Sequence, residues 1–526
     1  MSVSCKIEVT CKSATGTLPG RLLEFSPEGG YLDLRGLPPP AGHPVTLQWQ
    51  AGNEPIEVEA TVSWSRSSGL MGVRFPTPLR EAAVLLRGHA FEPRRTSSPA
   101  AQADAAGLML DHLYGGKELA KELLLATEAE GIYVRDTQGR EYIDCASGTF
   151  DQPLGYKHPV VVEAVQRQMK ELAYVGSPLL SHAQLELAAK LVAISPRNLT
   201  RVHLRDLTGS TAIEGAIKMA QAYTGKRGVI TLFAGHHGQT YFTTNLSGNA
   251  FRRQLYPVGG PEVVHVPPAQ CNRCFYGKTY PSCELLCVDR IQDFIEYASG
   301  GSVAAVVVEP VLGNGGNIVP PHGYFQKLRK LCDEHGMLLI FDEVQTGLGR
   351  LGHMFAADYF EVEPHIMVLA KGLGGPVPRG AILLEDRLEK MPRYQHSSTG
   401  GSSLVSVASA LATISVLQQP GFLERVRRVG AFLGERLQAL KEKHPIIGDV
   451  RGLGLMWGME IVLPNGAPDV ALCNRLAHEG REHGLLLRTS RYGYGNVIKV
   501  RPPLIITESQ VVELVGRLER LLRSVA

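Results

Sequence analysis

The feature that most restricts the fold is an alternation of uninterrupted apolar runs and amphipathic segments across residues 303–370. "VAAVVVE" ends at Glu309, "MLLIFDE" carries Asp342 near its end, and "IMVLA" is followed at once by Lys371. Short, continuous apolar runs are typical of strands buried on both faces. "GYFQKLRKLCDEHG", between the first two runs, has Phe325 and Leu328 at helical spacing. The order predicts parallel strands joined by right-handed crossovers, and hence an α/β fold.

The three predicted strands end on one edge of the sheet, which is where open α/β sheets bind ligands. Glu309, Asp342 and Lys371 are therefore expected to meet there. A buried carboxylate without a partner is costly, so Asp342 requires a cationic group nearby. A purely structural salt bridge would also satisfy this requirement.

A second segment, "VHLRDLTGSTAIEGAIKMAQAYTG", predicts a strand, a turn at residues 208–211 and a helix that Gly225 ends. The free N–H groups at the start of such a helix suit a phosphate, although Ser and Thr are also common there as simple caps. "GVITL" predicts the next strand, and His236 and His237 follow it in "LFAGHHGQT". Two histidines beside a glycine are also typical of an exposed polar loop.

Together these features predict one ligand with a phosphate, a cationic ring nitrogen and a carbonyl that condenses with a lysine. Pyridoxal 5′-phosphate (PLP) has all three, and a lysine Schiff base with an aspartate at the ring nitrogen is its usual protein environment. Asp342 would then keep the ring nitrogen protonated.

From about residue 110 onward the chain resembles the class III (ω-type) aminotransferases of fold-type I. The resemblance is carried, in family order, by "GIYVRDTQGREYIDCASG", "LGYKHPVVVEAV", "TGSTAIEGAIKMA", "GHHGQT", "VVVEPVLGNGG", "IFDEVQTGLGR", "VLAKGLGG", "HSSTGGSS" and "NVIKVRPPLIIT". It implies a mostly parallel sheet flanked by helices, a smaller α+β domain, and a homodimer with active sites built from both subunits.

The resemblance also assigns roles to single residues. Lys371 and Asp342 are the expected catalytic pair, Gln345 the contact to the ring hydroxyl, and Glu309 the acid on the substrate side. One of Ser398 and Thr399 is expected to reach the phosphate bound by the neighbouring subunit. The full expected cofactor-binding set is Gly209, Ser210, Thr211, His236, His237, Glu309, Asp342, Gln345, Lys371, Ser398 and Thr399.

Two positions depart from the family pattern. His236 stands where an aromatic residue usually stacks on the cofactor ring, and an imidazole brings less apolar area. Lys499 stands where many members have an arginine for an α-carboxylate, with Arg501 two residues later. Lysine cannot form the planar bidentate contact that arginine makes with a carboxylate. We therefore expect a preference for ω-amino compounds, amines or phosphorylated amines, with Lys499 and Arg501 as substrate residues.

The expected reaction is transamination between a primary amine, ω-amino or amino acid donor and a keto acid or aldehyde acceptor. A racemase or epimerase, or a phospho-lyase, of the same fold would use the same residues. A signalling or scaffold protein with a vestigial catalytic domain is a third possibility from a different class.

Residues 1–91 contain short alternating segments separated by Gly- and Pro-rich turns, which predicts a small all-β barrel or sandwich. "GRLLEFSPEGGYLDL" resembles a PilZ domain, a module that binds cyclic di-GMP, with Glu24, Ser26 and Gly29 in the usual motif. The paired arginines that grip this ligand are missing, and only Lys6 and Lys12 precede the expected first strand. We therefore expect a docking or dimer-contact role and little affinity for cyclic di-GMP.

The predicted organisation is a barrel at 1–91, a linker at 92–107 and an aminotransferase region at 108–526. In that region, about 166–414 form the large domain, and 108–165 with 415–526 form the small one. The linker is rich in Ala, Ser and Pro.

An inserted loop spaces four cysteines as C-x₂-C-x₈-C-x₃-C, at Cys271, Cys274, Cys283 and Cys287. Such a set suits zinc or an iron–sulfur cluster, and free thiols in a surface loop are the alternative.

The net charge of +3 provides no case for nucleic acid or an anionic membrane, and no apolar run has the length of a membrane span. The first residues lack the apolar core of a signal peptide, and nine cysteines do not form a secreted disulfide pattern. A cytoplasmic protein is expected.

Overall fold

The structure is a computed structural model, and it describes residues 3–14, 16–26, 29–35, 39–51, 54–65, 70–74, 124–176, 179–254, 260–392 and 394–525. By internal contacts the chain divides into two compact units, Met1–Leu123 and Leu124–Ala526. The predicted linker at 92–107 lies outside the described residues.

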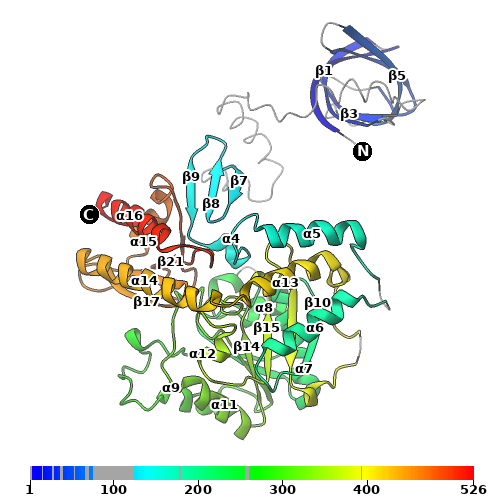
Figure 1. Cartoon of the computed structure of the whole chain (residues 1–526). Helices are drawn as coiled ribbons and strands as arrows, with labels where there is room; N and C mark the ends of the chain where they lie inside the picture. The colour runs from blue at the N-terminus through cyan, green and yellow to red at the C-terminus, as the bar shows by residue number, and fades with distance from the viewer. Residues whose placement is uncertain are drawn as a thin grey trace. The chain divides into compact units, whose positions relative to one another are not determined.

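The first unit contains a closed antiparallel barrel, as predicted (Figure 1). Its strands, in the barrel order β1-β2-β3-β6-β5-β4, are β1 (Val3–Ser13), β2 (Gly16–Ser26), β3 (Gly29–Leu34), β6 (Leu70–Arg74), β5 (Glu54–Ser65) and β4 (Pro44–Ala51). Alternate residues fill the interior, because successive side chains on a strand point to opposite faces. Val9, Cys11, Leu32, Leu47 and Met71 are among those buried there.

The prediction that Lys6 and Lys12 precede the first strand is wrong, since both lie within β1. Lys12 is exposed and its neighbour Cys11 is buried, which is the alternation of a strand with one face in the core. The side chains of Lys6, Glu24 and Ser26 lie outside the described part of the barrel.

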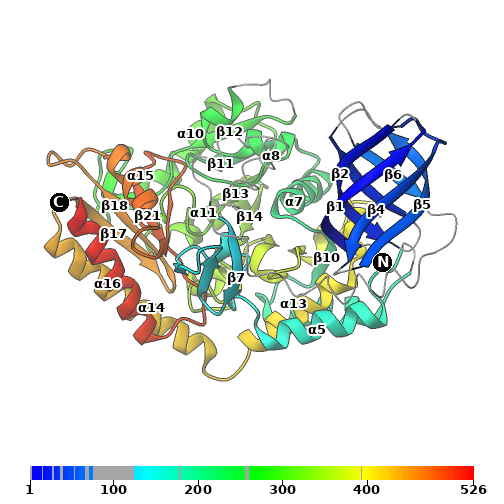
Figure 2. The same ribbon diagram turned by 90° about the horizontal axis from the view of Figure 1, so that it is seen from above.

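The second unit is built on a seven-stranded sheet with the order β10-β16-β15-β14-β13-β11-β12 (Figures 1 and 2). The bounds are β10 (Arg201–Asp206), β11 (Gly228–Leu232), β12 (Val263–Val266), β13 (Val303–Val308), β14 (Leu338–Asp342), β15 (Ile366–Leu369) and β16 (Gly380–Leu384). Strands β12 to β15 are parallel along the sheet, and β16 runs antiparallel to both of its neighbours. The α/β prediction and the three parallel strands are confirmed.

Helices cover both faces of this sheet. Odd and even residues of the central strands enter different clusters: Ile340 and Val368 pack with α7 (Gly209–Thr224), whereas Phe341 and Leu369 share a cluster with residues of α11 (Tyr324–Glu334). Because the strands are buried on both sides, their sequences are continuously apolar.

The other helices surround this core and extend it. Figures 1 and 2 show α5 along α13 and α14 along α16. Their bounds are α4 (Ser147–Phe150), α5 (Pro159–Glu171), α6 (His182–Ile194), α8 (Tyr241–Leu246), α9 (Leu286–Asp289), α10 (Ile291–Tyr297), α12 (Ala356–Tyr359), α13 (Leu404–Leu417), α14 (Phe422–Lys443), α15 (Val470–Glu479) and α16 (Glu508–Ser524). The short 3₁₀ helices are η2 (Ala250–Arg253), η3 (Cys271–Arg273), η4 (Lys371–Leu373), η5 (Asp386–Leu388) and η6 (Thr399–Ser402).

Two four-stranded sheets complete the second unit. One has the order β17 (Ile447–Leu453), β18 (Met456–Ile461), β21 (Val497–Val500) and β20 (Arg488–Thr489). The other joins β19 (Leu485–Leu486) to β9 (Glu141–Asp144), β8 (Tyr133–Asp136) and β7 (Ala126–Glu130). The parallel pairing of β19 with β9 brings the beginning and the end of this unit into one layer.

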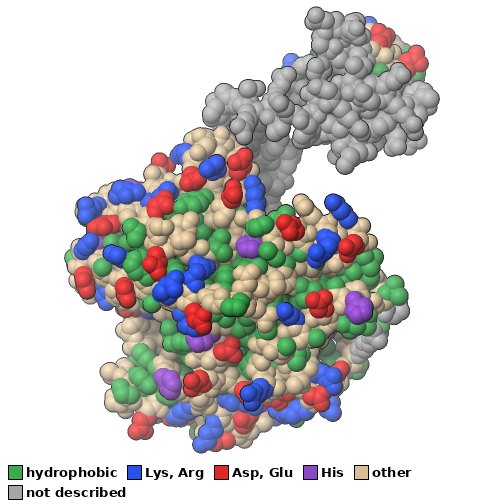
Figure 3. Space-filling model, viewed as in Figure 1, with side chains coloured by type: hydrophobic (Ala, Val, Ile, Leu, Met, Phe, Trp, Pro, Cys, Tyr) green, Lys and Arg blue, Asp and Glu red, His purple; other side chains and the backbone are tan. Residues whose placement is uncertain are grey.

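On the face shown in Figure 3, basic and acidic side chains of the described residues are interspersed, in keeping with the small net charge. No single described helix is long and apolar enough to cross a membrane; α13 and α14 pass that test only as a pair, bent by 73°.

Candidate active site

The sheet brings Glu309, Asp342 and Lys371 together at the ends of β13, β14 and β15. Asp342 is the last residue of β14 and pairs with Val368, three residues before Lys371. Lys371 opens η4 with a φ of 41°, an uncommon conformation for a residue with a side chain. Burial lowers the pKa of the Lys371 amine, while the nearby carboxylates of Asp342, Asp151 and Glu309 raise it.

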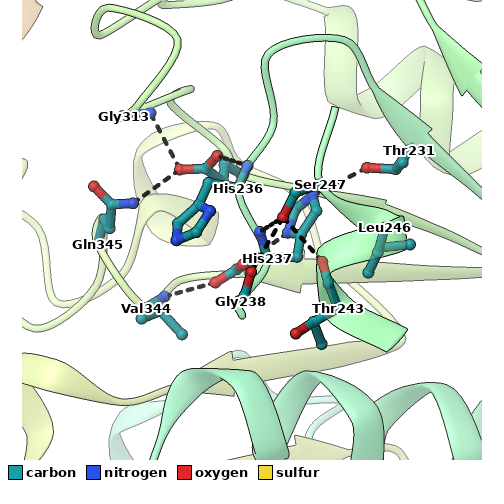
Figure 4. A network of polar contacts seen from close by, with 12 residues as sticks. Thr231, His236, His237, Gly238, Thr243, Leu246, Ser247, Gly313, Val344 and Gln345 are labelled. Carbon is teal, nitrogen blue, oxygen red and sulfur yellow. Dashed lines mark hydrogen bonds and ion pairs between the residues drawn. The ribbon is translucent and has the colours of Figure 1, made fainter. Parts of the chain in front are cut away.

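The buried carboxylate of Asp342 has a specific partner in His237. The Nδ1 atom of His237 lies 2.7 Å from Oδ2 of Asp342, and its Nε2 lies 3.0 Å from the hydroxyl of Thr231 (Figure 4). A carboxylate only accepts, so Nδ1 carries a proton. His237 is only 2% exposed. The alternative interpretation, in which both histidines belong to an exposed polar loop, is therefore wrong for His237.

Glu309 lies in a second network beside this pair. Its carboxylate accepts hydrogen bonds from the backbone N–H of His236 at 2.8 Å, from that of Gly313 at 3.1 Å and from the amide of Gln345 at 3.3 Å (Figure 4). Burial, with a smaller contribution from Asp342, raises the pKa of Glu309 to about 7. Glu309 is thus a buried carboxyl group that can exchange a proton near neutral pH.

His236 is half-buried and contacts a residue from the other end of the chain. Its Nδ1 lies 2.7 Å from the hydroxyl of Tyr492, and the two rings are tilted with centroids 5.3 Å apart. Burial, followed by the charge of Lys371, lowers the pKa of His236 to about 3, so the imidazole is neutral at physiological pH.

The turn before α7 lies against the histidine segment. Thr208 caps the helix by accepting from the N–H of Thr211 at 3.2 Å, and the Ser210 hydroxyl accepts from the N–H of Gln239 at 3.1 Å. A side chain at Gly238 would meet the hydroxyl of Ser210 at 2.5 Å, so only glycine fits there. Gly209, Ser210 and Thr211 are half-buried, and they form the start of a helix of 16 residues.

Two buried cations lie on the β21 side of the site. The Nζ atom of Lys499 donates to Oδ1 of Asn314 at 3.2 Å, and the guanidinium of Arg501 lies 4.1 Å from the ring centroid of Phe150. The same ring is 5.9 Å from Nζ of Lys371. Burial lowers the pKa of Arg501 to about 9, and burial and neighbouring arginines lower that of Lys499. Among the described residues, neither cation forms an ion pair with a carboxylate.

Ser398 and Thr399 contact β10 and the α5 side of their own chain. The Ser398 hydroxyl donates to the carbonyl of Arg205 at 2.7 Å, and the Tyr174 hydroxyl donates to the carbonyl of Thr399 at 3.1 Å. Their expected contribution to a neighbouring subunit stays a prediction.

The four loop cysteines line one small cavity of about 20 Å³. All four are free, and burial raises the pKa of Cys287 to about 11, with the other three as smaller contributors. A group of described residues elsewhere has all its ligand atoms within 4.8 Å of one another, but that group does not include these cysteines. A metal at Cys271, Cys274, Cys283 and Cys287 therefore stays a prediction.

Several residues of the site were not expected from the sequence. Phe150 and Asp151 lie near Lys371, Thr231 supports His237, and Tyr492 contacts His236. Phe150 and Asp151 lie two and three residues after the motif "YIDCASG", which was a usable signal. Tyr492 lies in a Gly-rich stretch, "RYGYGN", that has no comparable signal.

Comparison with known proteins assigns both parts of the chain to families. Residues 114–522 match the family model "Aminotransferase class-III", and residues 3–91 match that of the PilZ domain. A leucine/methionine racemase of Thermococcus litoralis is 34% identical over 76% of this chain and 91% of its own length. An acetylornithine aminotransferase of Methanosarcina mazei is 34% identical over 78% and 94%, respectively.

Among solved structures, an amine transaminase from an uncultivated Pseudomonas species in its PLP-bound form superposes with a TM-score of 0.72. It is 30% identical, and the match covers 77% of this chain and 95% of that one. The chain therefore belongs to the class III aminotransferases, and it is a PLP-dependent transaminase.

Proposed function

We propose that Lys371 holds PLP covalently, that Asp342 faces its ring nitrogen, and that the donors are primary amines with an anionic group away from the amine. The observation that carries the assignment is the meeting of Lys371 with a buried Asp342 at the ends of adjacent strands. The Asp342 carboxylate accepts a hydrogen bond from Nδ1 of His237 at 2.7 Å.

The residues present fit the cofactor. The N-terminal turn of α7 offers N–H groups and two hydroxyls for the phosphate, from Ser210 and Thr211. Gln345, 6% exposed beside Asp342, would hold the ring hydroxyl. When bound, PLP supplies an electron sink that stabilises negative charge on the carbon bearing the amino group.

The chain itself supplies the proton transfer and the electrostatics. Burial lowers the pKa of Lys371, which increases the fraction of its amine that is neutral and able to take a proton from the substrate carbon. A positioned base of this kind typically contributes about 10²–10⁴-fold to the rate. The buried carboxylate of Asp342 would stabilise a positive charge on the ring nitrogen, and this charge keeps the electron sink effective.

The test is Lys371→Ala, with Lys330→Ala, at an exposed position of α11, as the matched control. The wild-type holoenzyme should be yellow and should become covalently labelled when it is reduced with borohydride. Lys371→Ala should lose the label and at least about 10²-fold in turnover, whereas the control should lose neither. Unchanged labelling of Lys371→Ala would contradict the assignment, and a colourless wild type would favour a vestigial domain.

The substrate preference follows from the two unpaired cations. Lys499 and Arg501 are each 2% exposed and have no carboxylate partner among the described residues. A buried charge requires a counter-charge, and the ammonium of Lys499 is a point charge that cannot form the planar bidentate contact of an arginine. These features support ω-amino acids and phosphorylated amines as donors, with a keto acid as acceptor.

A donor panel measured as single half-reactions tests this preference. Arg501→Met should raise KM for anionic donors by tenfold or more, since removing one partner of a buried charge pair costs about 2–5 kcal/mol, and should spare uncharged amines. Arg475→Gln, an exposed arginine on α15, is the control and should change neither. Fastest turnover with plain α-amino acids would contradict the proposal.

Racemisation is a second candidate, because a leucine/methionine racemase is among the similar proteins. Return of the proton to the same carbon, rather than release of a keto product, would interconvert enantiomers. Incubation of one enantiomer without any keto acid separates the two: loss of optical purity reports racemisation, and retention reports transamination alone.

We further propose a homodimer. Apolar side chains on α5 and just after it are exposed, including Met169, Leu172, Tyr174, Leu179 and Leu180. An apolar patch of this kind marks an interaction surface. Tyr174 also contacts Thr399, so the same surface carries the residues expected to serve the neighbouring subunit.

A further inference from the structure

Away from the catalytic residues, three metal-ligating side chains meet at the end of β10. Nε2 of His396 lies 3.1 Å from Oδ1 of Asp206, and Nε2 of His203 lies 3.6 Å from Oδ2 of the same carboxylate. One ligand atom from each residue lies within 4.8 Å of the other two. Two imidazoles and a carboxylate are a common ligand set for divalent transition metals.

Two of these atoms have no hydrogen-bond partner among the described residues. They are Oδ2 of Asp206 and Nε2 of His203, and Asp206 is only 1% exposed. A buried carboxylate oxygen without a donor is costly, and a cation between the two atoms would satisfy both.

The position of the histidines is set by packing. A side chain atom at Gly215 on α7 would lie 2.5 Å from Nε2 of His396, so the ring occupies the space that the glycine leaves. The rings of His203 and His396 have centroids 5.6 Å apart.

The cluster is open on one side. His203 and His396 line a cavity of about 870 Å³, together with Leu180, Leu185 and Met391. This cavity leaves space for water as a further ligand.

Neighbouring positive charges disfavour a bound cation and limit the expected affinity of the site. Arg379, which is fully buried, and Arg205 both act electrostatically near the cluster. The exposed amine of Lys218 lies 3.4 Å from Nδ1 of His396. Because metal binding at Nε2 moves the proton to Nδ1, the ammonium of Lys218 has to move away.

We propose that His203, Asp206 and His396 bind one divalent transition-metal ion, such as zinc, separately from the catalytic site. The ion would tie the end of β10, two residues before Thr208, to the segment that leads to Ser398. Its effect is structural: it fixes two segments that adjoin the phosphate-binding turn. The proposal does not depend on which substrate the enzyme uses.

The test is calorimetric titration of the chelator-treated, full-length holoenzyme with Zn²⁺, free of excess cofactor. We expect a Zn²⁺ site, in addition to any at the cysteine loop, whose affinity falls about tenfold or more in His203→Gln and in His396→Gln. His322→Gln, an exposed histidine elsewhere, should leave it unchanged. Lys218→Gln should tighten binding several-fold, because it removes the competing ammonium and offers an amide oxygen to Nδ1–H.

Cobalt distinguishes this site from the cysteine loop, since thiolate ligands give a charge-transfer absorption that imidazole and carboxylate ligands lack. Absence of Zn²⁺ binding, or binding that neither histidine variant weakens, would overturn the proposal. A cobalt spectrum with a thiolate band only would do the same. If both histidine variants fail to fold, as judged by circular dichroism, the tightening in Lys218→Gln decides.

Discussion

At the scale of single residues, the orientation of Asp342 depends on His237. The imidazole donates to Oδ2 from Nδ1 at 2.7 Å and is itself fixed by Thr231 at 3.0 Å. The other carboxylate oxygen accepts from the backbone of Val344 at 3.1 Å. Both oxygens are therefore held before any ligand arrives, so little reorganisation is needed on binding.

Replacing His237 by Phe should lower kcat by tenfold or more. It removes a charge-assisted bond and leaves a buried carboxylate oxygen unsatisfied, which costs about 1–3 kcal/mol. Steady-state kinetics with one good donor measures this change. His236→Phe, which restores the aromatic residue usual in the family, should stay within threefold of the wild type; equal losses in both variants would contradict the distinct role of His237.

This residue-level picture was only partly predictable. Lys371, Asp342 and Glu309 could be predicted because each stands directly after a continuous apolar strand. The burial of His237 could not, since its partner is 105 positions away and the local sequence is polar and Gly-rich. The same holds for Tyr492, which is 256 positions from His236.

At the scale of elements, the segment after β14 is held by a second acid. Glu343 is buried and accepts from the N–H groups of Ala356 at 2.8 Å and Ala357 at 2.9 Å, and from the hydroxyl of Thr346 at 2.9 Å. It therefore satisfies the free N–H groups at the start of α12, as a capping side chain does. Burial raises its pKa from 4.5 to about 7.

Glu343→Gln should destabilise the protein by about 1–3 kcal/mol at pH 5, because an amide nitrogen cannot accept from Ala356. The folded protein holds the proton of Glu343 more tightly than the unfolded chain does, so wild-type stability decreases as the pH rises from 4.5 through about 7. The penalty of the variant should therefore shrink over that range. Urea unfolding at several pH values measures it.

The control for this experiment is Glu334→Gln, since Glu334 lies exposed on α11 with a distant lysine partner at 3.7 Å. Its effect should stay below about 1 kcal/mol at every pH. A penalty of Glu343→Gln that grows with pH would contradict the assigned direction of the pKa shift.

Elements differed in how well they could be predicted. β11 has the predicted bounds, and α7 ends at Gly225, because continuous apolar runs and glycine stops are local signals. β1 was missed although apolar and polar residues alternate along it from Val3 to Lys12. The antiparallel direction of β16 and the pairing of β19 with β9 depend on contacts between distant segments.

At the scale of the whole molecule, the exposed apolar side chains on and after α5 bear on how subunits assemble. Leu172 and Leu180, 49% and 64% exposed, belong to the apolar surface described above. Burial of such side chains contributes about 1.5–3 kcal/mol each, so a partner subunit would cover them.

A double variant, Leu172→Asp with Leu180→Asp, should convert the dimer to monomers and abolish turnover, because Ser398 and Thr399 would no longer reach a neighbouring site. Light scattering after size exclusion gives the mass, and a donor assay gives the activity. Val512→Asp, on an exposed apolar position of α16, is the matched control and should leave both unchanged. Full activity in a monomeric double variant would refute the shared site.

The barrel leads to a separate prediction. Calorimetry of the full-length protein with cyclic di-GMP should show no binding at micromolar concentrations, because the paired arginines that grip this ligand are missing from the sequence. Binding in that range would show that other cations replace them.

The register of β14 against β15 has one more consequence. Asp342 pairs with Val368, so the acid and the amine of Lys371 are aligned by a single ladder. A slip by one residue would displace one strand by about 3.3 Å and turn its side chains to the opposite face. Such a misassembled chain could not retain its coenzyme. Yellow colour in a purified batch is therefore expected to report molecules in which β14 and β15 pair in this register.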